Sequence, residues 1–458
     1  MSKIIVGMSG GVDSAVTAYL LKLAGHDVIG VTLRVWMSSD GKDSRCCEID
    51  DARRVAWKLN MPYYVVSCLS EFNNLITAPF VLSYLNGTTP NPCVLCNRYI
   101  KWDKMLESAE VMGASHIATG HYASVVQKEN GRFTVKRAKY AQKDQTYMLY
   151  RLTQEQLSGT IMPLGQLSKE EVRQIARSAG IPVAEKKDSQ EICFVTDGNY
   201  SDYVEENAAQ VVNYGGNSVD KDADKSLFSG GNFVDKDGNK SVFSGGDFVD
   251  KDADKSVFSG GNFVDKDVDK SVFSGGDSVD KDVDKSVFSG GNSVDKDADK
   301  SVFSGGNSVD KDIDKSVFSG GDFVDKDGNI LGRHRGIIHY TVGQRKGLGL
   351  SLGYPVYVTK INAAKNEVVV GSEESLYSRE VICNDLNFLS IPELREGERL
   401  RCTAKIRYHH KAQAAYIELY DSDKVKISFD EPVKAAAPGQ SAVFYDDEDC
   451  VIGGGIII

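Results

Sequence analysis

A glycine-rich loop between an apolar run and an amphipathic segment constrains the fold of this 458-residue chain more than any other feature. Residues 3–25, KIIVGMSGGVDSAVTAYLLKLAG, read as a short strand, a turn containing Ser9-Gly10-Gly11, and a helix. Glycines permit a tight turn and bring backbone N–H groups close to a phosphate, while the helix dipole favours negative charge at that end. The loop lacks the lysine of a Walker A sequence, so it favours a nucleotide site other than that of a phosphoryl-transfer P-loop.

Strand-like and helix-like segments continue to alternate after this loop. They are residues 26–36, 48–60, 62–68 and 114–123. This alternation predicts an α/β fold with a parallel, doubly wound sheet and a ligand beyond the carboxyl ends of its strands. Leu33 and Gly120 lie at two such ends, where they would either frame an adenine or serve in packing.

A 15-residue unit, NSVDKDADKSLFSGG and its close variants, repeats seven times over residues 217–321, with a partial eighth copy at 322–329. The seven copies hold 22 acidic and 14 basic residues, so they carry −8 of the net charge of −11. Excising them joins NYGG to DFVDKDGNILGRHRG as one uninterrupted segment, which suggests tandem duplication of a native turn. The acidity therefore belongs mainly to an insertion.

The repeat unit has turn residues, Ser-Gly-Gly and Asp-Lys-Asp, on either side of a few apolar positions. A flexible or loosely hairpin-like insertion is the favoured interpretation. The alternative is a calcium array, because Asp220, Asp222 and Asp224 alternate along the chain. Most copies lack the glycine at the sixth position of a calcium loop and none has the glutamate at the twelfth, which argues against calcium.

Composition predicts a cytoplasmic protein. Nine cysteines are scattered along the chain, an odd number that does not suggest a disulfide framework. No apolar run approaches the roughly 20 residues needed to span a bilayer, so no membrane is expected as a partner, and no signal-peptide cleavage site follows the N-terminus.

Residues 89–97, TPNPCVLCN, contain a Cys-x-x-Cys pair, Cys93 and Cys96. Such a pair serves as a zinc half-site, a redox disulfide, a pair of cluster ligands or a sulfur-handling nucleophile. Zinc is disfavoured because no second Cys-x-x-Cys or suitably spaced histidine pair follows. Cys193, in the segment DSQEICF, is a further candidate, although a single cysteine is often an inert small hydrophobe.

Taken together, seven segments of the chain resemble tRNA-specific 2-thiouridylases of the MnmA family. These segments are GMSGGVDS (7–14), TPNPCVLCN (89–97), ATGHYA (118–123), KDQTYML (143–149), DSQEICF (188–194), GRHRGIIHYTVGQRKGLG (332–349) and PGQSAVFYDDEDCVIGGGII (438–457). The resemblance runs from end to end, apart from the repeats. In it, Ser-Gly-Gly-x-Asp-Ser after a strand is the loop of ATP pyrophosphatases, which transfer AMP to an oxygen and release pyrophosphate.

The resemblance implies three domains: an ATP-pyrophosphatase α/β domain, a small central domain and a C-terminal β-barrel. We place them at residues 1–205, 206–380 and 381–458, the second holding the repeats. Short alternating strands in the C-terminal third agree with a barrel. The implied activity is adenylation by ATP, with Mg²⁺, of the C2 oxygen of wobble uridine 34 in tRNAs for Lys, Glu and Gln. Sulfur then comes from a cysteine persulfide that a cysteine desulfurase or a sulfur-relay protein supplies; the alternative sulfur donor is sulfide.

The resemblance also implies roles for individual residues. Cys193 matches the persulfide carrier and Cys96 its nucleophilic partner, with a Cys96–Cys193 disulfide formed between them. ATP contacts are implied for Gly7, Met8, Ser9, Gly10, Gly11, Val12, Asp13, Ser14, Leu33 and Gly120. The segment facing the target base is Asn91, Pro92 and Cys93, and further tRNA contacts are implied for His121, Lys143, Asp144, Gln145, Arg407, Tyr408 and Gln440.

Cys93 departs from the family pattern, in which many members carry Asp. The departure opens a second mechanism, in which Cys93, Cys96 and Cys193 hold a [4Fe–4S] cluster whose fourth iron binds the sulfide. The sequence leaves both the persulfide mechanism and the cluster mechanism open. Cys46 and Cys47 would at most assist in sulfur relay.

Two groups of basic residues would contact phosphates and make tRNA binding dependent on salt. They are Arg132, Lys136, Arg137, Lys139 and Lys143, and Arg333, Arg335, Arg345 and Lys346. Two rival functions remain: another adenylating ATP pyrophosphatase, such as a synthetase or amidotransferase, and an acidic interaction module carried on a vestigial enzyme. Cys96 and Cys193 argue against the first, and the intact glycine loop argues against the second.

Overall fold

The computed structural model describes residues 1–36, 48–186, 192–195, 199–212 and 318–458, together with short strands between 227 and 303. The chain forms two compact units, one of Met1–Glu206 with Ser316–Ile458 and the other of Asn207–Lys315. Cys46, Cys47 and residues 188–191 of the DSQEICF segment lie outside the described residues.

A five-stranded parallel sheet organises the first domain, as the strand–helix alternation predicts. Its order is β3-β2-β1-β4-β7. After β1 the chain adds β2 and β3 on one side of β1, and then β4 and β7 on the other side. The ligand site of such a sheet lies where the direction reverses, here between β1 and β4. The strands are β1 (Lys3–Gly7), β2 (Asp27–Arg34), β3 (Tyr63–Ser67), β4 (His116–Ala118) and β7 (Thr160–Ile161).

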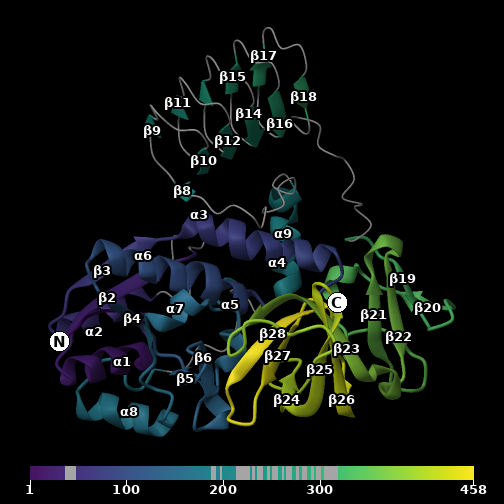
Figure 1. The fold of residues 1–458 in the computed structure, drawn as a ribbon. Helices are drawn as coiled ribbons and strands as arrows, with labels where there is room; N and C mark the ends of the chain where they lie inside the picture. Colours follow the sequence, from purple (N-terminus) through teal and green to yellow (C-terminus); the bar gives the residue numbers. More distant parts are fainter. Residues whose placement is uncertain are drawn as a thin grey trace. The chain divides into compact units, whose positions relative to one another are not determined.

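Helices cover both faces of this sheet (Figure 1). Along β1, Ile4 and Val6 face one core while Ile5 faces the other, as strand alternation requires. The first core is shared with α1 (Val12–Leu23), α2 (Ile49–Lys58) and α8 (Lys169–Ser178), and the second with α6 (Asp103–Val111).

Two helical rods contain π-helical segments. The first comprises α3 (Leu69–Phe72), η1 (Asn73–Thr77) and α4 (Ala78–Leu85), and the second comprises α5 (Pro92–Leu95), η2 (Cys96–Trp102) and α6. Segment η1 packs against α5 and η2. The helix α9 (Tyr200–Val212) reaches the first rod through Tyr200, whose ring stacks on Tyr84 at 4.5 Å.

A hairpin, two 3₁₀ segments and a short α-helix complete the first domain. Their bounds are β5 (Ala123–Gln127), β6 (Phe133–Arg137), η3 (Ala141–Lys143), η4 (Thr146–Met148) and α7 (Gln154–Ser158). Helix α7 and helix α8 each begin with a capping box, from Thr153 with Gln156 and from Ser168 with Glu171.

The C-terminal strands close into an antiparallel barrel of order β23-β26-β25-β24-β27-β28, confirming the predicted architecture. Its strands are β23 (Tyr377–Phe388), β24 (Arg399–Lys405), β25 (Gln413–Asp421), β26 (Lys424–Lys434), β27 (Ser441–Tyr445) and β28 (Val451–Ile457). Between barrel and first domain in the sequence lies a four-stranded sheet of order β20-β19-β22-β21. It consists of β19 (Asp322–Val324), β20 (Ile330–Arg333), β21 (Tyr357–Asn362) and β22 (Glu367–Gly371).

The barrel docks on the β5–β6 hairpin through basic side chains. Arg132 donates from Nε and Nη2 to the carbonyl oxygens of Leu389 (2.8 Å) and Phe388 (2.9 Å). Arg137 pairs with Asp449 at 2.8 Å and lies over the Tyr445 ring at 3.7 Å. Arg132 thus has two of its donors occupied by barrel carbonyls, whereas Arg137 Nη2 is buried without a hydrogen-bond partner among the described residues. The phosphate role expected of these residues remains a prediction.

Strands from successive copies of the repeat pair with one another in parallel. One sheet consists of β8 (Leu227–Ser229), β10 (Ser241–Ser244), β12 (Ser256–Ser259), β14 (Ser271–Ser274), β16 (Ser286–Ser289) and β18 (Ser301–Phe303). A second consists of β9 (Phe233–Val234), β11 (Phe248–Val249), β13 (Phe263–Val264), β15 (Ser278–Asp280) and β17 (Ser293–Asp295). Neighbouring strands in each sheet are offset by one 15-residue copy. Phe243, for example, pairs with Phe258, one copy further along. The described strands thus form successive coils of a solenoid and not hairpins, which corrects the hairpin-like expectation. Asp220, Asp222 and Asp224, on which the calcium alternative rests, lie outside the described residues.

The partial eighth copy has a different structure from the others. Its DFV forms β19, and its Asp325 accepts hydrogen bonds from the backbone N–H groups of Asp327 and Asn329, both at 2.9 Å. This Asx turn leads into β20 and closes an antiparallel hairpin. The hairpin agrees with the hypothesis that the repeats arose from a native turn.

Within the described part of the chain, no helix has both the length and the apolar character required to cross a bilayer.

Candidate active site at the carboxyl edge of the sheet

The glycine loop lies where β1 ends and α1 begins. Its backbone is fixed by short-range bonds: the Ser9 N–H donates to Ser14 Oγ (3.2 Å), and Ser14 Oγ donates to the Gly11 carbonyl (3.1 Å). The Met8 N–H donates to the Val31 carbonyl on β2 (2.8 Å), and the Met8 carbonyl accepts from Thr32 Oγ1 (2.6 Å). The loop is thus held in one conformation before any ligand binds, at the start of a twelve-residue helix.

Two glycines are required by close approaches. Gly10 has φ +77°, and a Cβ there would lie 2.5 Å from the Glu48 carbonyl oxygen. A Cβ on Gly120 would lie 2.8 Å from both the Asp13 carbonyl carbon and the Ser14 backbone nitrogen. The end of β4 therefore abuts the first residues of α1, which brings two of the predicted ATP positions together. Leu33 lies near the end of β2 and is partly buried.

Asp13 is fixed by two neighbours that the sequence did not single out. Tyr122 Oη donates to Asp13 Oδ1 at 2.7 Å, and Lys169 Nζ contacts both carboxylate oxygens at 2.8 Å. Lys186 Nζ also reaches the loop, 3.3 Å from the Gly10 carbonyl oxygen. Tyr122 falls inside the ATGHYA segment, but nothing in the sequence places the two lysines here, because each is far from the loop along the chain.

The segment 143–149 is joined to this edge through Tyr122. Gln145 Oε1 accepts from the Tyr122 N–H (2.9 Å), and the Gln145 N–H donates to the Tyr122 carbonyl (3.1 Å). Asp144 is buried, and its carboxylate accepts from the Thr146 hydroxyl at 2.9 Å and from backbone N–H groups. Lys143 is partly buried. Asp144 and Gln145 therefore organise this segment.

Segment 143–149 in turn holds the Cys-x-x-Cys helix. Asn97 Nδ2 donates to the Met148 carbonyl (3.0 Å), and Asn91 Nδ2 lies 3.5 Å from the Met148 sulfur. From the barrel, Gln440 Nε2 donates to the Thr89 carbonyl at 2.9 Å. A continuous set of contacts thus runs from the glycine loop through Tyr122 and Met148 to residues 89–97.

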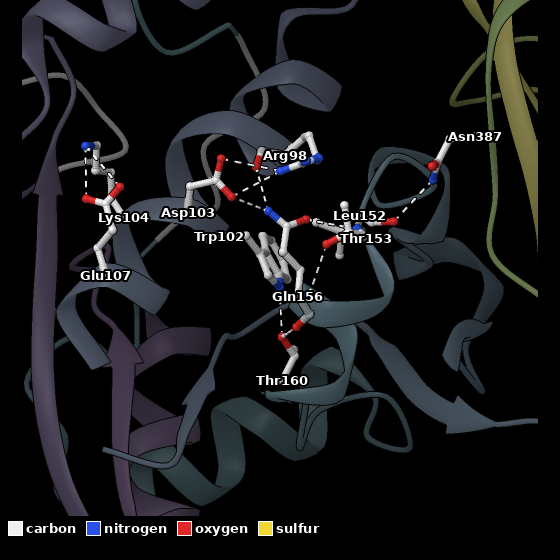
Figure 2. A network of polar contacts seen from close by, with 10 residues as sticks. All are labelled: Arg98, Trp102, Asp103, Lys104, Glu107, Leu152, Thr153, Gln156, Thr160 and Asn387. Carbon is white, nitrogen blue, oxygen red and sulfur yellow. Dashed lines mark hydrogen bonds and ion pairs between the residues drawn. The ribbon is translucent and has the colours of Figure 1, made fainter. Parts of the chain in front are cut away.

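Cys96 begins the π-helical segment η2, and Figure 2 shows how the far end of that segment is anchored. Gln156 Nε2 donates to the Arg98 carbonyl (2.9 Å), while Trp102 Nε1 donates to Thr160 Oγ1 (2.8 Å). Asp103, which pairs with Arg98 at 3.1 Å, also accepts from Gln156. The wider turn of a π-helix shifts the backbone register, and such segments are frequent at functional sites.

His121 lies one residue beyond Gly120, with its ring 5.3 Å from that of Trp102. Its Nδ1 is 3.0 Å from Thr119 Oγ1. Burial, aided by the charge of Lys101, lowers the pKa of His121 to about 3, so its imidazole is neutral near pH 7. A neutral imidazole at this position can hydrogen-bond a base without adding charge.

Cys93 is exposed, Cys96 is buried and Cys193 is partly buried. The segment carrying Cys193 is anchored by buried Phe194, whose ring packs on Phe80 (5.1 Å) and Phe72 (5.7 Å) of the first rod. Because that rod packs on α5 and η2 through η1, the Cys193 segment and the Cys96 helix belong to one assembly of helices. Burial raises the pKa values of Cys68, Cys383 and Cys402 to about 12, which marks these three as inert.

The three candidate thiols do not gather into a metal site. Among the residues that the structure describes, no three His, Cys, Asp or Glu side chains are arranged to hold a metal ion, and Cys93, Cys96 and Cys193 are all within that set. A cluster with three thiolate ligands needs all three at one point. The arrangement seen does not fit the cluster.

Arg407 and Tyr408 follow β24. Arg407 Nη2 donates to the Val342 carbonyl at 2.8 Å, and its Nε is buried without a hydrogen-bond partner. The Tyr408 ring lies 6.1 Å from the ring of buried Tyr147. Burial raises the pKa of Tyr408, and the nearby charges of Asp144 and Cys93 add to the rise.

Three family models match this chain. The tRNA methyl transferase HUP domain matches residues 2–197, the tRNA methyl transferase PRC-barrel domain residues 311–372, and the aminomethyltransferase beta-barrel domain residues 378–457. These matches cover the parallel-sheet domain, the central sheet and the closed barrel, in the order in which the structure has them.

Full-length relatives decide the family. A tRNA-specific 2-thiouridylase MnmA of Lachnoclostridium phytofermentans is 40% identical over 465 residues, covering 100% of both chains. The chain belongs to the MnmA family of tRNA-specific 2-thiouridylases. A further MnmA, of Acetivibrio thermocellus, is 39% identical over 463 residues and covers 99% of each chain.

Solved structures align less well than the MnmA sequences. A U34-tRNA thiolase, NcsA, of Methanococcus maripaludis with its [4Fe–4S] cluster matches at 18% identity and a TM-score of 0.27, covering 46% of this chain and 67% of its own.

Proposed function

We infer that this chain is an ATP-dependent tRNA-uridine 2-sulfurtransferase that acts on the wobble uridine 34 of tRNAs for Lys, Glu and Gln. The observation that carries this conclusion is the continuous set of contacts from the glycine loop to the helix of Cys96. Through these contacts the proposed nucleotide site and the proposed sulfur nucleophile would act at one edge of the sheet. Family membership supports the same reaction.

The first step activates an oxygen. The uridine C2 oxygen attacks the α-phosphorus of ATP, the N3 proton is lost, and pyrophosphate leaves. N–H groups of residues 9–11 and the N-terminus of α1 would stabilise charge on the phosphates. Mg²⁺ would supply further positive charge there. Asp13 carries the carboxylate oxygens that this ion prefers, and it would hold the ion only in place of its contacts with Lys169 and Tyr122.

The second step forms the carbon–sulfur bond. The terminal sulfur of a Cys193 persulfide attacks C2 and AMP leaves with the oxygen. The Cys96 thiolate then attacks the Cys193 sulfur, and the sulfur–sulfur bond breaks with its electron pair going to the thiouridine. The resulting Cys96–Cys193 disulfide is reduced by an external thiol. Thiolates are nucleophilic near neutral pH, which suits both attacks.

The partners follow from this chemistry. A persulfide must be renewed in each cycle, so the chain would work with a cysteine desulfurase or a sulfur-relay protein, in the cytoplasm where its tRNA substrate lies. A [4Fe–4S] cluster is not needed for the reaction.

The test is a single-turnover assay with unmodified tRNA-Glu, ATP and persulfide-loaded protein, followed by measurement of AMP and 2-thiouridine. C193S and C96S should each lose thiolation by more than a hundredfold. The matched control is C450S, because Cys450 Sγ already donates to the Glu448 carbonyl (3.9 Å) and a hydroxyl can do the same. Undiminished thiolation in C193S would refute the proposed sulfur route.

A further inference from the structure

Lys405, the last residue of β24, is a partly buried cation among aromatic rings. Its Nζ lies 5.8 Å from the centroid of the Tyr147 ring and 5.6 Å from that of Tyr408. Rings at this distance attract an ammonium weakly. They also exclude water from one side of it, and burial accordingly lowers the pKa of Lys405.

The positive charge of Lys405 is not balanced by an ion pair within the described part of the chain. Asp144 favours the charged form, but that carboxylate already accepts hydrogen bonds from Thr146 and from backbone N–H groups. The other nearby charges are positive: the charge of Arg137 also lowers the pKa of Lys405, and His410 has its pKa lowered by burial and then by Arg407, Lys405 and His409. The cations repel one another.

Arg407 adds an independent sign of an absent anion. Its Nε is a buried donor without an acceptor, and burial lowers the pKa of its guanidinium. A protein that holds cations partly out of water without an ion pair loses hydration energy, which an anionic ligand can restore. The Tyr408 ring lies 5.6 Å from Lys405 Nζ, and the charge of Cys93 contributes to the raised pKa of Tyr408.

We propose that Lys405 binds a backbone phosphate of the tRNA beside the target uridine, together with Arg407. The proposal rests on the proposed function and extends it by a residue that the resemblance does not include. A phosphate fits better than a base because two adjacent cations match its charge, whereas a uracil carbonyl is neutral. Tyr408 would then lie between the phosphate and the base-facing residue Cys93.

The experiment measures the affinity of the full chain for unmodified tRNA-Glu between 50 and 300 mM KCl. Removing one cation that binds a phosphate should reduce the slope of log K against log salt by about 0.7–0.9. K405M removes the charge and keeps the apolar stem beside Tyr147, K405Q is a second neutral variant, and K405R keeps the charge. The control is K424M, since Lys424 pairs with Asp421 (3.3 Å) at the β25–β26 turn.

K405M and K405Q should each lower the slope by this amount and weaken binding about fivefold to tenfold at 100 mM KCl, while K405R and K424M keep the wild-type slope. An unchanged slope in whichever neutral variant retains the wild-type melting temperature would overturn the proposal. If the wild-type chain itself failed to bind tRNA, the proposed function would fail before this inference was reached.

Discussion

Two sets of basic side chains lie where the barrel meets the first domain, and the fold uses them differently. On the β5–β6 hairpin, Arg132 and Arg137 are matched by barrel carbonyls and a carboxylate. After β24, Lys405 and Arg407 are partly buried with no carboxylate paired to them in the described part of the chain. Arg132 therefore serves in the contact with the barrel, and we propose that Lys405 and Arg407 bind an anionic substrate. Arg137 is intermediate, because it pairs with Asp449 but keeps a buried Nη2 without a partner among the described residues.

Charge in a sequence does not distinguish these sets. A cationic side chain opposite a buried carbonyl donates a hydrogen bond to that carbonyl. When the side chain is removed, the buried carbonyl is left without a hydrogen-bond donor. A cation without such a partner costs free energy in the absence of its ligand. The difference predicts which substitutions affect stability and which affect tRNA binding.

The largest expected effect is on stability. R132M removes the donors that reach Phe388 and Leu389, and Gln154 supplies only a longer bond to Leu389 (3.2 Å). The free energy of unfolding should fall by about 2–3 kcal/mol, as measured by urea denaturation. The slope of tRNA affinity against salt should not change. If R132M lowered the slope of tRNA affinity against salt and left the free energy of unfolding unchanged, Arg132 would belong with Lys405 and Arg407.

R407M should affect both properties, because Arg407 donates to Val342 and also has a buried, unpartnered Nε. We expect a loss of about 1–2 kcal/mol in unfolding free energy and a lower salt slope for tRNA. If only stability fell, Arg407 would belong with Arg132.

Q440L tests a neutral contact across the same junction. Gln440 fixes the Thr89 carbonyl at the start of the TPNPCVLCN segment. Its loss should reduce kcat for thiolation about tenfold, equivalent to about 1.4 kcal/mol, and change the tRNA Kd less than twofold. The control is Q127L, since Gln127 donates to Gly131 inside its own hairpin (3.0 Å). Equal kcat losses in both variants would count against a positioning role.

H410Q tests the comparison through the pH dependence of the free energy of unfolding. Burial and neighbouring cations lower the pKa of His410 in the folded chain, while the unfolded chain has a value near 6.5. As pH falls below 6.5 the unfolded state binds the proton first, so stability from this group is present above 6.5 and lost below it. Denaturation at pH 5, 6 and 7 should show a shallower decline in H410Q. An identical decline would mean that His410 is not coupled to these cations.

The smallest effect should come from D449N. Asp449 is 60% exposed, and Arg137 stays over the Tyr445 ring when the ion pair is removed. Exposed ion pairs contribute under about 1 kcal/mol, so the melting temperature should fall by no more than a few degrees. A loss as large as that of R132M would show that this pair carries the docking of the barrel.

Much of the fold follows from the sequence, because local pattern determines it. The strand–loop–helix pattern predicts the parallel sheet and the position of residues 7–14. The barrel is implied by the family resemblance, and the short alternating strands of the C-terminal third agree with it. The domain boundaries at 205 and 380 and the roles of individual site residues remain predictions.

The rest of the fold and of the site depends on contacts between residues that are far apart in the sequence. A local sequence pattern does not predict such contacts. Arg132 faces barrel carbonyls more than 250 positions away, and Asp13 meets Lys169 from a distant helix. The resemblance implies that Asp144 contacts tRNA, yet tertiary packing buries its side chain. In the repeats, apolar alternation is compatible with either hairpins or coils, and the 15-residue offset of strand partners favours coils.

The central claim is that cysteines, and no bound metal, transfer sulfur to a tRNA uridine. The most direct test compares iron-depleted and iron-reconstituted protein under anaerobic conditions, with ATP, unmodified tRNA-Glu, cysteine and a cysteine desulfurase. Mass spectrometry of the digested tRNA should show equal 2-thiouridine in both preparations and none with C193S. Thiolation that appears only after reconstitution with iron would contradict this account.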